Sequence, residues 1–350
     1  MPLARDAVTA ARTSKDDRLI ARALLVLGRA SMSTDPDHAA APLNEAMLTA
    51  IASGQDELAT EAYARHGFVV GAFSGVELAE ALGRRAGERG AFARALLANN
   101  RGALSMISGD ARAARAQYRS ALDLGRAVSG PDAFELLIAT SNLAMLTPEA
   151  DERRELYARA LATTKDAVGA DHPQTLVREL QLAADDTDPR AVVGKLRDLC
   201  DRMARLHSHL RVYVEYCAFE LVWQATALGD TTSLRAALAL AEPQTPATFV
   251  EHMLVYYRAI SERSTTGALL DEAEQLARDE RSHIGLERYG NAADAELAVV
   301  SLARIAGDTA RMKRALEAAN ADLGQLVATM GAEGGYAQRR RSWARTLASD

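Results

Sequence analysis

The chain has 350 residues, of which 48% are apolar and 25% are charged, so its composition excludes an intrinsically disordered protein. Aromatic residues supply only 5%, whereas alanine alone occupies 72 positions, which favours closely packed helices over strands. The formal charge of −6 disfavours a general electrostatic attraction to nucleic acid or to an anionic membrane. These totals indicate a helical protein whose partners are other proteins.

Cysteine content and the absence of targeting patterns bear on location. Cys200 and Cys217 are too few for a disulfide framework, and we expect both to be small buried hydrophobic residues in a reducing compartment. The sequence has no uninterrupted apolar stretch of about 18 residues, so no membrane span is predicted. Residues 1–16 lack the apolar centre of a secretory signal. We therefore expect a cytoplasmic protein, and 37 arginines against 4 lysines point to a GC-rich bacterial genome.

Helix-breaking residues divide the chain at a regular interval, and apolar residues recur at helical spacing between them. The first set of breakers has steps of 34 to 41 residues and comprises Asp35, Gly75, Gly109, Pro148, Asp188, Gly229, Gly267 and Gly307. A second set lies about half a period away, at Gly54, Gly90, Gly130, 169–173, 243–246 and 285–290. Each period of about 40 residues therefore predicts two helices of about 14 to 20 residues joined by tight turns.

Three of these breakers are Gly-Asp pairs that follow one apolar run and open the next. They begin at Gly109, Gly229 and Gly307. Glycine can adopt the left-handed conformation that ends a helix, and aspartate can accept hydrogen bonds from the N–H groups that begin one. We therefore expect each pair to form the turn between two helices.

Two adjacent segments carry a more specific pattern. Residues 109–132 (GDARAARAQYRSALDLGRAVSGPD) and 149–176 (EADERRELYARALATTKDAVGADHPQTL) both contain Tyr-x-x-Ala-Leu, followed eight residues after the leucine by glycine. This pattern resembles the tetratricopeptide repeat (TPR), in the longer form of about 42 residues found in kinesin light chains. The resemblance is best over residues 96–186 and implies a right-handed α-solenoid of helical hairpins. Similar repeats accompany kinase domains in bacterial signalling proteins, but the kinase motifs are missing from this sequence.

The tyrosines of the repeated pattern have a predicted packing role. Tyr118 lies between Ala114 and Ala121 on one helix face, at i, i+4 and i+7. Alanine lets a neighbouring helix approach closely, and tyrosine fills the remaining space between hairpins. We expect Tyr118 and Tyr157 to belong to the core.

The resemblance also implies a binding surface, because the first helix of each TPR hairpin lines the concave face. In kinesin-light-chain repeats an asparagine nine residues before the turn glycine binds the partner's backbone. The corresponding residues here are Asn100, Asn142 and Gln181, followed by Glu220 and Arg258 in later repeats. An amide offers both a donor and an acceptor to a peptide backbone. The same amides could instead join neighbouring helices, and the sequence leaves these two alternatives equal.

The densest aromatic cluster lies around the later groove positions. It comprises Tyr213, Tyr216, Phe219, Trp223, Tyr256 and Tyr257. Aromatic side chains anchor bound segments, and Trp223 beside Glu220 is the groove candidate, but we expect at least half of the cluster in the core. A second TPR class grips a C-terminal carboxylate through several lysines and arginines, and the sequence does not predict that clamp.

The sequence contains no motif for catalysis or for a cofactor: it has no Walker loop, no G-x-S-x-G elbow and no dinucleotide fingerprint. His207 and His209 form a His-x-His pair, but on a helix their side chains diverge by about 200° and no further ligand accompanies them. We predict no enzyme activity, no cofactor and no metal site. The basic run 339–341 beside Trp343 is interpreted as the solvated face of a capping helix near residues 334–348.

Together these patterns predict an all-α protein, a single TPR-like right-handed α-solenoid of about eight helical hairpins over residues 1–350. The predicted function is that of a non-enzymatic scaffold that binds a protein or peptide in its concave groove, without nucleic acid or membrane partners. The alternative is the regulatory or substrate-recognition region of a larger bacterial signalling protein, such as a TPR-containing serine/threonine kinase. The oligomeric state and the identity of the partner stay open.

Overall fold

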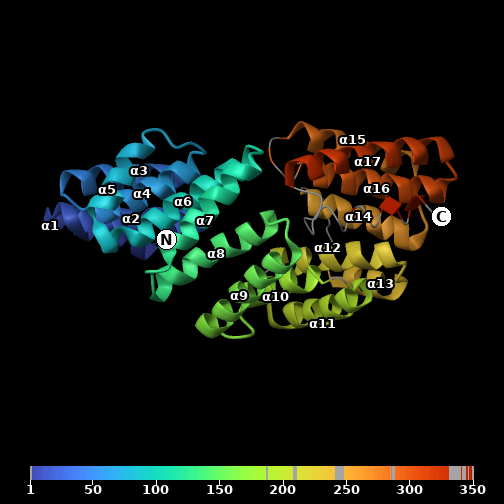
Figure 1. Ribbon diagram of the computed structural model, residues 1–350, viewed down its shortest axis with the longest axis horizontal. Coiled ribbons are helices and arrows are strands. Elements are labelled where there is room, and N and C mark those ends of the chain that lie inside the picture. Colours follow the sequence, from blue (N-terminus) through green and yellow to red (C-terminus); the bar gives the residue numbers. More distant parts are fainter. Residues whose placement is uncertain are drawn as a thin grey trace. The chain divides into compact units, whose positions relative to one another are not determined.

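The structure is a computed structural model that describes residues 2–186, 188–207, 211–240, 248–283, 285, 288–330, 340, 344–345 and 347–348. Within these residues it contains 17 α-helices and no strand (Figure 1). The all-α prediction is confirmed. The chain divides into two compact units, Met1–Leu143 and Ala144–Asp350, called unit 1 and unit 2 below. The prediction of a single domain over residues 1–350 stays a prediction.

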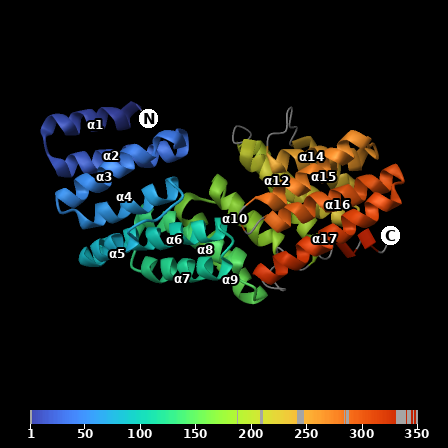
Figure 2. The same cartoon turned by 90° about the horizontal axis from the view of Figure 1, so that it is seen from above.

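Unit 1 is a stack of antiparallel helices (Figures 1 and 2). Each helix from α1 to α7 packs against the next in the chain, and α4 also packs against both α2 and α6. The elements are α1 (Pro2–Ser14), α2 (Asp17–Thr34), α3 (Ala40–Ala52), α4 (Asp56–Val69), α5 (Val76–Arg85), α6 (Ala91–Ile107), α7 (Ala111–Gly125) and most of α8 (Gly130–Leu146), with short 3₁₀ turns at Pro36–His38 and Gly87–Gly90.

Unit 2 repeats the same arrangement. Each helix from α9 to α17 packs against the next, and the even-numbered helices α10, α12, α14 and α16 also pack in succession against one another. The helices are α9 (Ala150–Val168), α10 (Pro173–Ala184), α11 (Pro189–His207), α12 (Arg211–Leu228), α13 (Thr231–Leu240), α14 (Phe249–Glu262), α15 (Gly267–Ser282), α16 (Arg288–Ala306) and α17 (Thr309–Met330).

The spacing of the helices agrees with the period found in the sequence. The even-numbered helices from α2 to α16 begin at residues 17, 56, 91, 130, 173, 211, 249 and 288, which are intervals of 35 to 43 residues. One odd-numbered helix follows each of them, so the described residues contain eight consecutive helix pairs after α1. The prediction of two helices in each period of about 40 residues is confirmed.

The Gly-Asp turns have the predicted geometry. Gly109, Gly229 and Gly307 have φ values of 89°, 67° and 75°, in the left-handed region where only glycine lacks a steric penalty. The aspartate after each glycine accepts hydrogen bonds from the first turn of the following helix. The donors are the N–H groups of Ala113 to Asp110, of Thr232 and Ser233 to Asp230, and of Arg311 to Asp308.

The repeated tyrosines are core residues, as predicted. Tyr118 in α7 is fully buried between the buried residues Ala114 and Ala121. Its ring lies so close to Gly102 of α6 that a Cβ atom at Gly102 would come within 2.8 Å of it. Burial raises the pKa of Tyr118 to about 12, and the side chain of Asn142 beside it opposes that shift. Tyr157 in α9 is also buried.

Two expectations about individual residues are wrong. Cys200 and Cys217 are buried but form a disulfide that joins α11 to α12, so the cysteine argument for a reducing compartment no longer holds. Cys200 lies seven residues before the end of α11 and Cys217 six residues after the start of α12, so the two cysteines occupy similar positions along the two helices. Arg340 is buried rather than solvated, although most of the predicted capping helix 334–348 lies outside the described residues.

No described helix is both long enough and apolar enough to span a bilayer.

Candidate functional site

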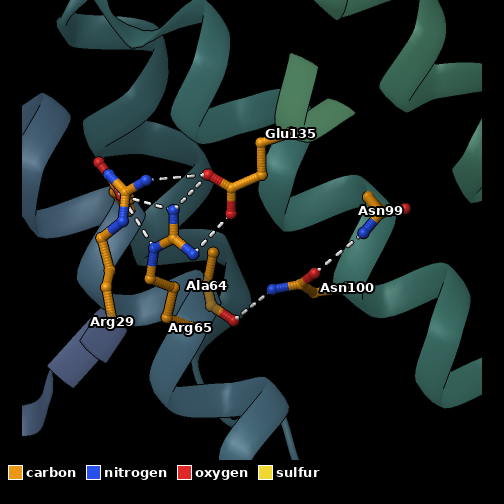
Figure 3. A network of polar contacts seen from close by, with 7 residues as sticks. Arg29, Ala64, Arg65, Asn99, Asn100 and Glu135 are labelled. Carbon is orange, nitrogen blue, oxygen red and sulfur yellow. Dashed lines mark hydrogen bonds and ion pairs between the residues drawn. The ribbon is translucent and has the colours of Figure 1, made fainter. Parts of the chain in front are cut away.

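One predicted groove residue of unit 1, Asn100, connects two helices of that unit (Figure 3). Asn100 of α6 is buried, and its amide donates to the Ala64 carbonyl of α4 over 3.1 Å. Its own oxygen accepts from Asn99 over 3.0 Å. Asn142 of α8 is half-buried and lies beside the Tyr118 hydroxyl. Of the two alternatives that the sequence leaves open, the Asn100 geometry matches the one in which an amide joins neighbouring helices.

A closed network of charged side chains lies beside Asn100 and connects α2, α4 and α8 (Figure 3). Arg65 donates to Glu61 over 2.8 Å and to both carboxylate oxygens of Glu135 over 2.7 and 2.9 Å, and Arg29 completes the cluster. Burial raises the pKa of Glu61 against the opposing charges of Arg65 and Arg29. Burial acts in the same direction on Glu135, but the two arginines outweigh it and lower the pKa of that carboxyl group. Each charged side chain of this network therefore pairs with an opposite charge within the network.

Unit 2 contains an open pocket of about 350 Å³ that is bordered by residues of α10, α12 and α14. A volume of this size lies in the range of sites for small ligands or for single side chains of a partner. The pocket combines aromatic rings with amide and charged groups. The aromatic residues are Tyr157, Tyr216, Phe219 and Phe249, the amides are Gln181 and Asn291, and the charged residues are Arg153, Asp185, Glu220 and Arg340.

One polar stripe of α10 leads into this pocket. Gln174, Arg178, Gln181 and Asp185 follow one another at intervals of three or four residues, which places them on one helix face. Gln174 donates to the Tyr213 hydroxyl of α12 over 3.0 Å, and Arg178 donates to the Gln181 side-chain oxygen over 3.0 Å. His172 precedes the stripe and caps α10, because its ring nitrogen accepts from the N–H of Gln174.

Ion pairs form two walls of the pocket. Arg153 pairs with Asp185 over 2.7 Å and also donates to the carbonyl groups of residues 147 and 148. On the opposite wall Arg340 pairs with the fully buried Asp294, which also accepts from the Trp223 indole N–H over 3.2 Å. Burial raises the pKa of Asp294 against the opposing effect of Arg340. These pairs hold the walls in place and leave little net charge on them.

The structure brings together only some of the predicted groove residues. Gln181 and Glu220 line the same pocket, whereas Trp223 is buried behind it against Asp294. Arg258 of α14 donates to the Leu238 carbonyl of α13 and so connects two helices. As expected, more than half of the aromatic cluster is in the core, namely Phe219, Trp223, Tyr256 and Tyr257.

Sequence reasoning missed several residues that shape the pocket. Arg178 precedes Gln181 by one helical turn, so the spacing already places both on one face, but nothing in the sequence shows that Arg178 is buried. Phe249 and Arg340 reach the pocket from elements that lie far from α10 in the sequence, and no local pattern marks them.

The described residues contain no group of three or more His, Cys, Asp or Glu side chains placed to hold a metal ion. His207 contacts the carbonyl of Asp171, and His209 lies outside the described residues.

The chain matches no protein-family description, and no curated protein sequence is significantly similar to it.

Proposed function

We propose that the protein is a non-enzymatic protein-binding module, and that a peptide segment of its partner binds over the pocket of unit 2. The observation that carries the proposal is the pocket itself, in which aromatic rings surround the predicted groove residues Gln181 and Glu220. Aromatic side chains in a pocket supply the contact area that dominates peptide recognition. We propose further that the paired helices form a right-handed TPR-like solenoid in a cytoplasmic bacterial signalling scaffold.

Two features of the pocket support binding of an extended segment. Tyr216 borders the pocket and keeps 38% of its surface exposed, so a bound segment can contact it. The pocket is bordered by successive even-numbered helices, α10, α12, α14 and α16, which lie in the order that an extended chain would cross them. The period of about 40 residues supports the TPR-like interpretation.

The test is selection of peptides from a random display library on the full chain, followed by fluorescence anisotropy with the enriched peptides. We expect Tyr216→Ala to weaken binding by about 1–2 kcal/mol with little change in the melting temperature, because the exposed ring contributes more to binding than to folding. Phe68→Ala in α4 is a matched control, since Phe68 is 37% exposed but lies outside the pocket. Equal losses for the two variants, or no enriched peptide, would contradict the proposal.

A further inference from the structure

Four arginines are buried in the described part of the chain, and three of them have a carboxylate partner. Arg65 pairs with Glu61 and Glu135, Arg153 pairs with Asp185, and Arg340 pairs with Asp294. Arg178 is the exception. Its side chain makes no ion pair with any described residue, although only 8% of the residue is exposed.

The only hydrogen-bond partner of Arg178 among the described residues is a neutral amide oxygen, that of Gln181. Its Nε atom is buried and makes no hydrogen bond there. A buried charge without a counter-ion destabilises a fold, because the lost hydration is not replaced. Burial accordingly lowers the pKa of Arg178, and only the nearby tyrosines Tyr157, Tyr216 and Tyr213 oppose that shift. Among the described residues, the Arg178 cation therefore has no compensating negative charge.

Gln181 connects this cation to the pocket. A guanidinium group only donates hydrogen bonds, so the Gln181 carboxamide must turn its oxygen toward Arg178. The Gln181 amide nitrogen then remains as a donor, and no described residue accepts from it. Because Gln181 lines the pocket, an acceptor that enters the pocket meets this N–H group with the positive charge of Arg178 behind it.

We propose that the Gln181 N–H group binds the side-chain carboxylate of an aspartate or glutamate in the partner peptide, and that the positive charge of Arg178 behind Gln181 stabilises the bound carboxylate. This inference rests on the proposed function and names the chemistry of the residue that is recognised. A carboxylate fits because its single negative charge balances the single positive charge of Arg178. A doubly charged phosphate would leave a surplus negative charge beside Asp185 and Glu220, which already border the pocket. The Tyr157 and Tyr216 rings then enclose the carbon chain of the acidic side chain.

The test uses the same peptide selection, with library peptides joined to the phage coat by their C-termini so that no free terminal carboxylate is present. On the wild-type chain we expect enrichment of Asp or Glu at one fixed position. On Arg178→Gln that preference should disappear, whereas on Arg159→Gln, which changes an exposed arginine of α9, it should remain. Replacing the selected acid by its amide should weaken binding to the wild-type chain about tenfold or more, and should change little on Arg178→Gln.

The failures of the two proposals can be told apart. If no peptide is enriched, peptide binding fails and this inference fails with it. If peptides are enriched without an acidic preference, or if the preference survives in Arg178→Gln, only the carboxylate site is overturned. Synthetic peptides that bind only through a free C-terminal carboxylate would overturn the assignment to a side chain.

Thermal melting of the unliganded chain gives a second readout. Since Arg178 has no counter-ion among the described residues, Arg178→Met should leave the melting temperature unchanged or raise it. Arg153→Met removes one partner of a buried pair and should lower the melting temperature by several degrees. A comparable loss for Arg178→Met would show that Arg178 is a structural residue and would overturn the carboxylate site.

Discussion

Both units consist of sequentially packed helix pairs, but the polar residues of their even-numbered helices have different partners. In unit 1 the amide of Asn100 donates to a neighbouring helix, and Arg65 lies between two carboxylates. In unit 2 the corresponding amide, Gln181, lines a pocket and has only Arg178 as its partner among the described residues. The residue type at a predicted groove position therefore does not determine its hydrogen-bond partners. The neighbouring helices determine whether those hydrogen bonds are satisfied within the fold.

This difference also predicts which polar residues contribute to stability and which contribute to binding. A polar cluster with all its charges paired holds helices together and gains nothing from a ligand. An unpaired cation beside an open pocket weakens the fold and gains from a ligand of opposite charge. Variants that remove one member of each cluster should therefore have opposite consequences in the two units.

The largest effect is expected from breaking the closed network of unit 1. Arg65→Ala leaves the carboxylates of Glu61 and Glu135 partly buried without their main partner, so it should reduce the free energy of unfolding by about 3–5 kcal/mol. Urea unfolding followed by circular dichroism measures this loss. Arg84→Ala is the control, because Arg84 is exposed and pairs with Glu80 at the surface, where a pair contributes little. Similar losses for the two variants would mean that the network does not stabilise unit 1.

The next largest loss of stability is expected from replacing the repeated tyrosines, Tyr118 and Tyr157. Tyr118→Ala should cost about 3 kcal/mol or more, because it leaves a cavity against Gly102 and the neighbouring alanines. Tyr157→Ala should cost less, because Tyr157 already borders the pocket and is 9% exposed. Urea unfolding of both variants gives the difference. If Tyr157→Ala proves the more costly variant, the pocket wall is packed as tightly as the core of unit 1.

The fold was predictable to the extent that it depends on local signals. The Gly-Asp turns, the period of about 40 residues and the burial of Tyr118 follow from backbone conformation, capping and spacing along one helix. The pocket was predictable at Gln181 and Glu220 and at two members of the aromatic cluster, Tyr216 and Phe219, whereas residues such as Phe249 and Arg340 reach it through packing between distant elements. The Cys200–Cys217 disulfide is an intermediate case. The two cysteines lie at similar distances from the connection between two successive helices, which favours a contact, but only the folded structure shows that the contact forms.

Replacing the side-chain amides of Asn100 and Gln181 should have a smaller effect, and it tests directly the difference between the two units. Asn100→Ala removes the hydrogen bond to Ala64 and leaves Asn99 without an acceptor, so it should cost about 1–2 kcal/mol of stability. Gln181→Ala should change stability little and should weaken binding of the selected peptides. Melting curves and anisotropy on both variants separate the two outcomes. The reverse pattern would place the binding amide in unit 1 and the structural amide in unit 2.

The smallest effect concerns the same Gly-Asp turn in the two units. Asp110 accepts from the N–H of Ala113, whereas Asp230 accepts from the N–H groups of Thr232 and Ser233 and from the Ser233 hydroxyl. At neutral pH either aspartate replaced by alanine should cost about 1 kcal/mol, with the larger loss at Asp230 because it satisfies more donors.

Only the ionised form of Asp230 accepts all these hydrogen bonds, so its contribution depends on pH. The backbone N–H of Ser233, followed by its hydroxyl, lowers the pKa of Asp230 from its ordinary value of 3.8. A carboxyl group with a lowered pKa stabilises the fold fully above its unfolded value, and this stabilisation is lost as the pH falls through the folded value. The cost of Asp230→Ala, measured by urea unfolding, should therefore be constant near neutral pH and shrink below about pH 4. A cost that stays constant down to about pH 2 would mean that the neutral carboxyl group caps α13 equally well, and that the extra donors around Asp230 add nothing to the turn that unit 1 builds at Asp110.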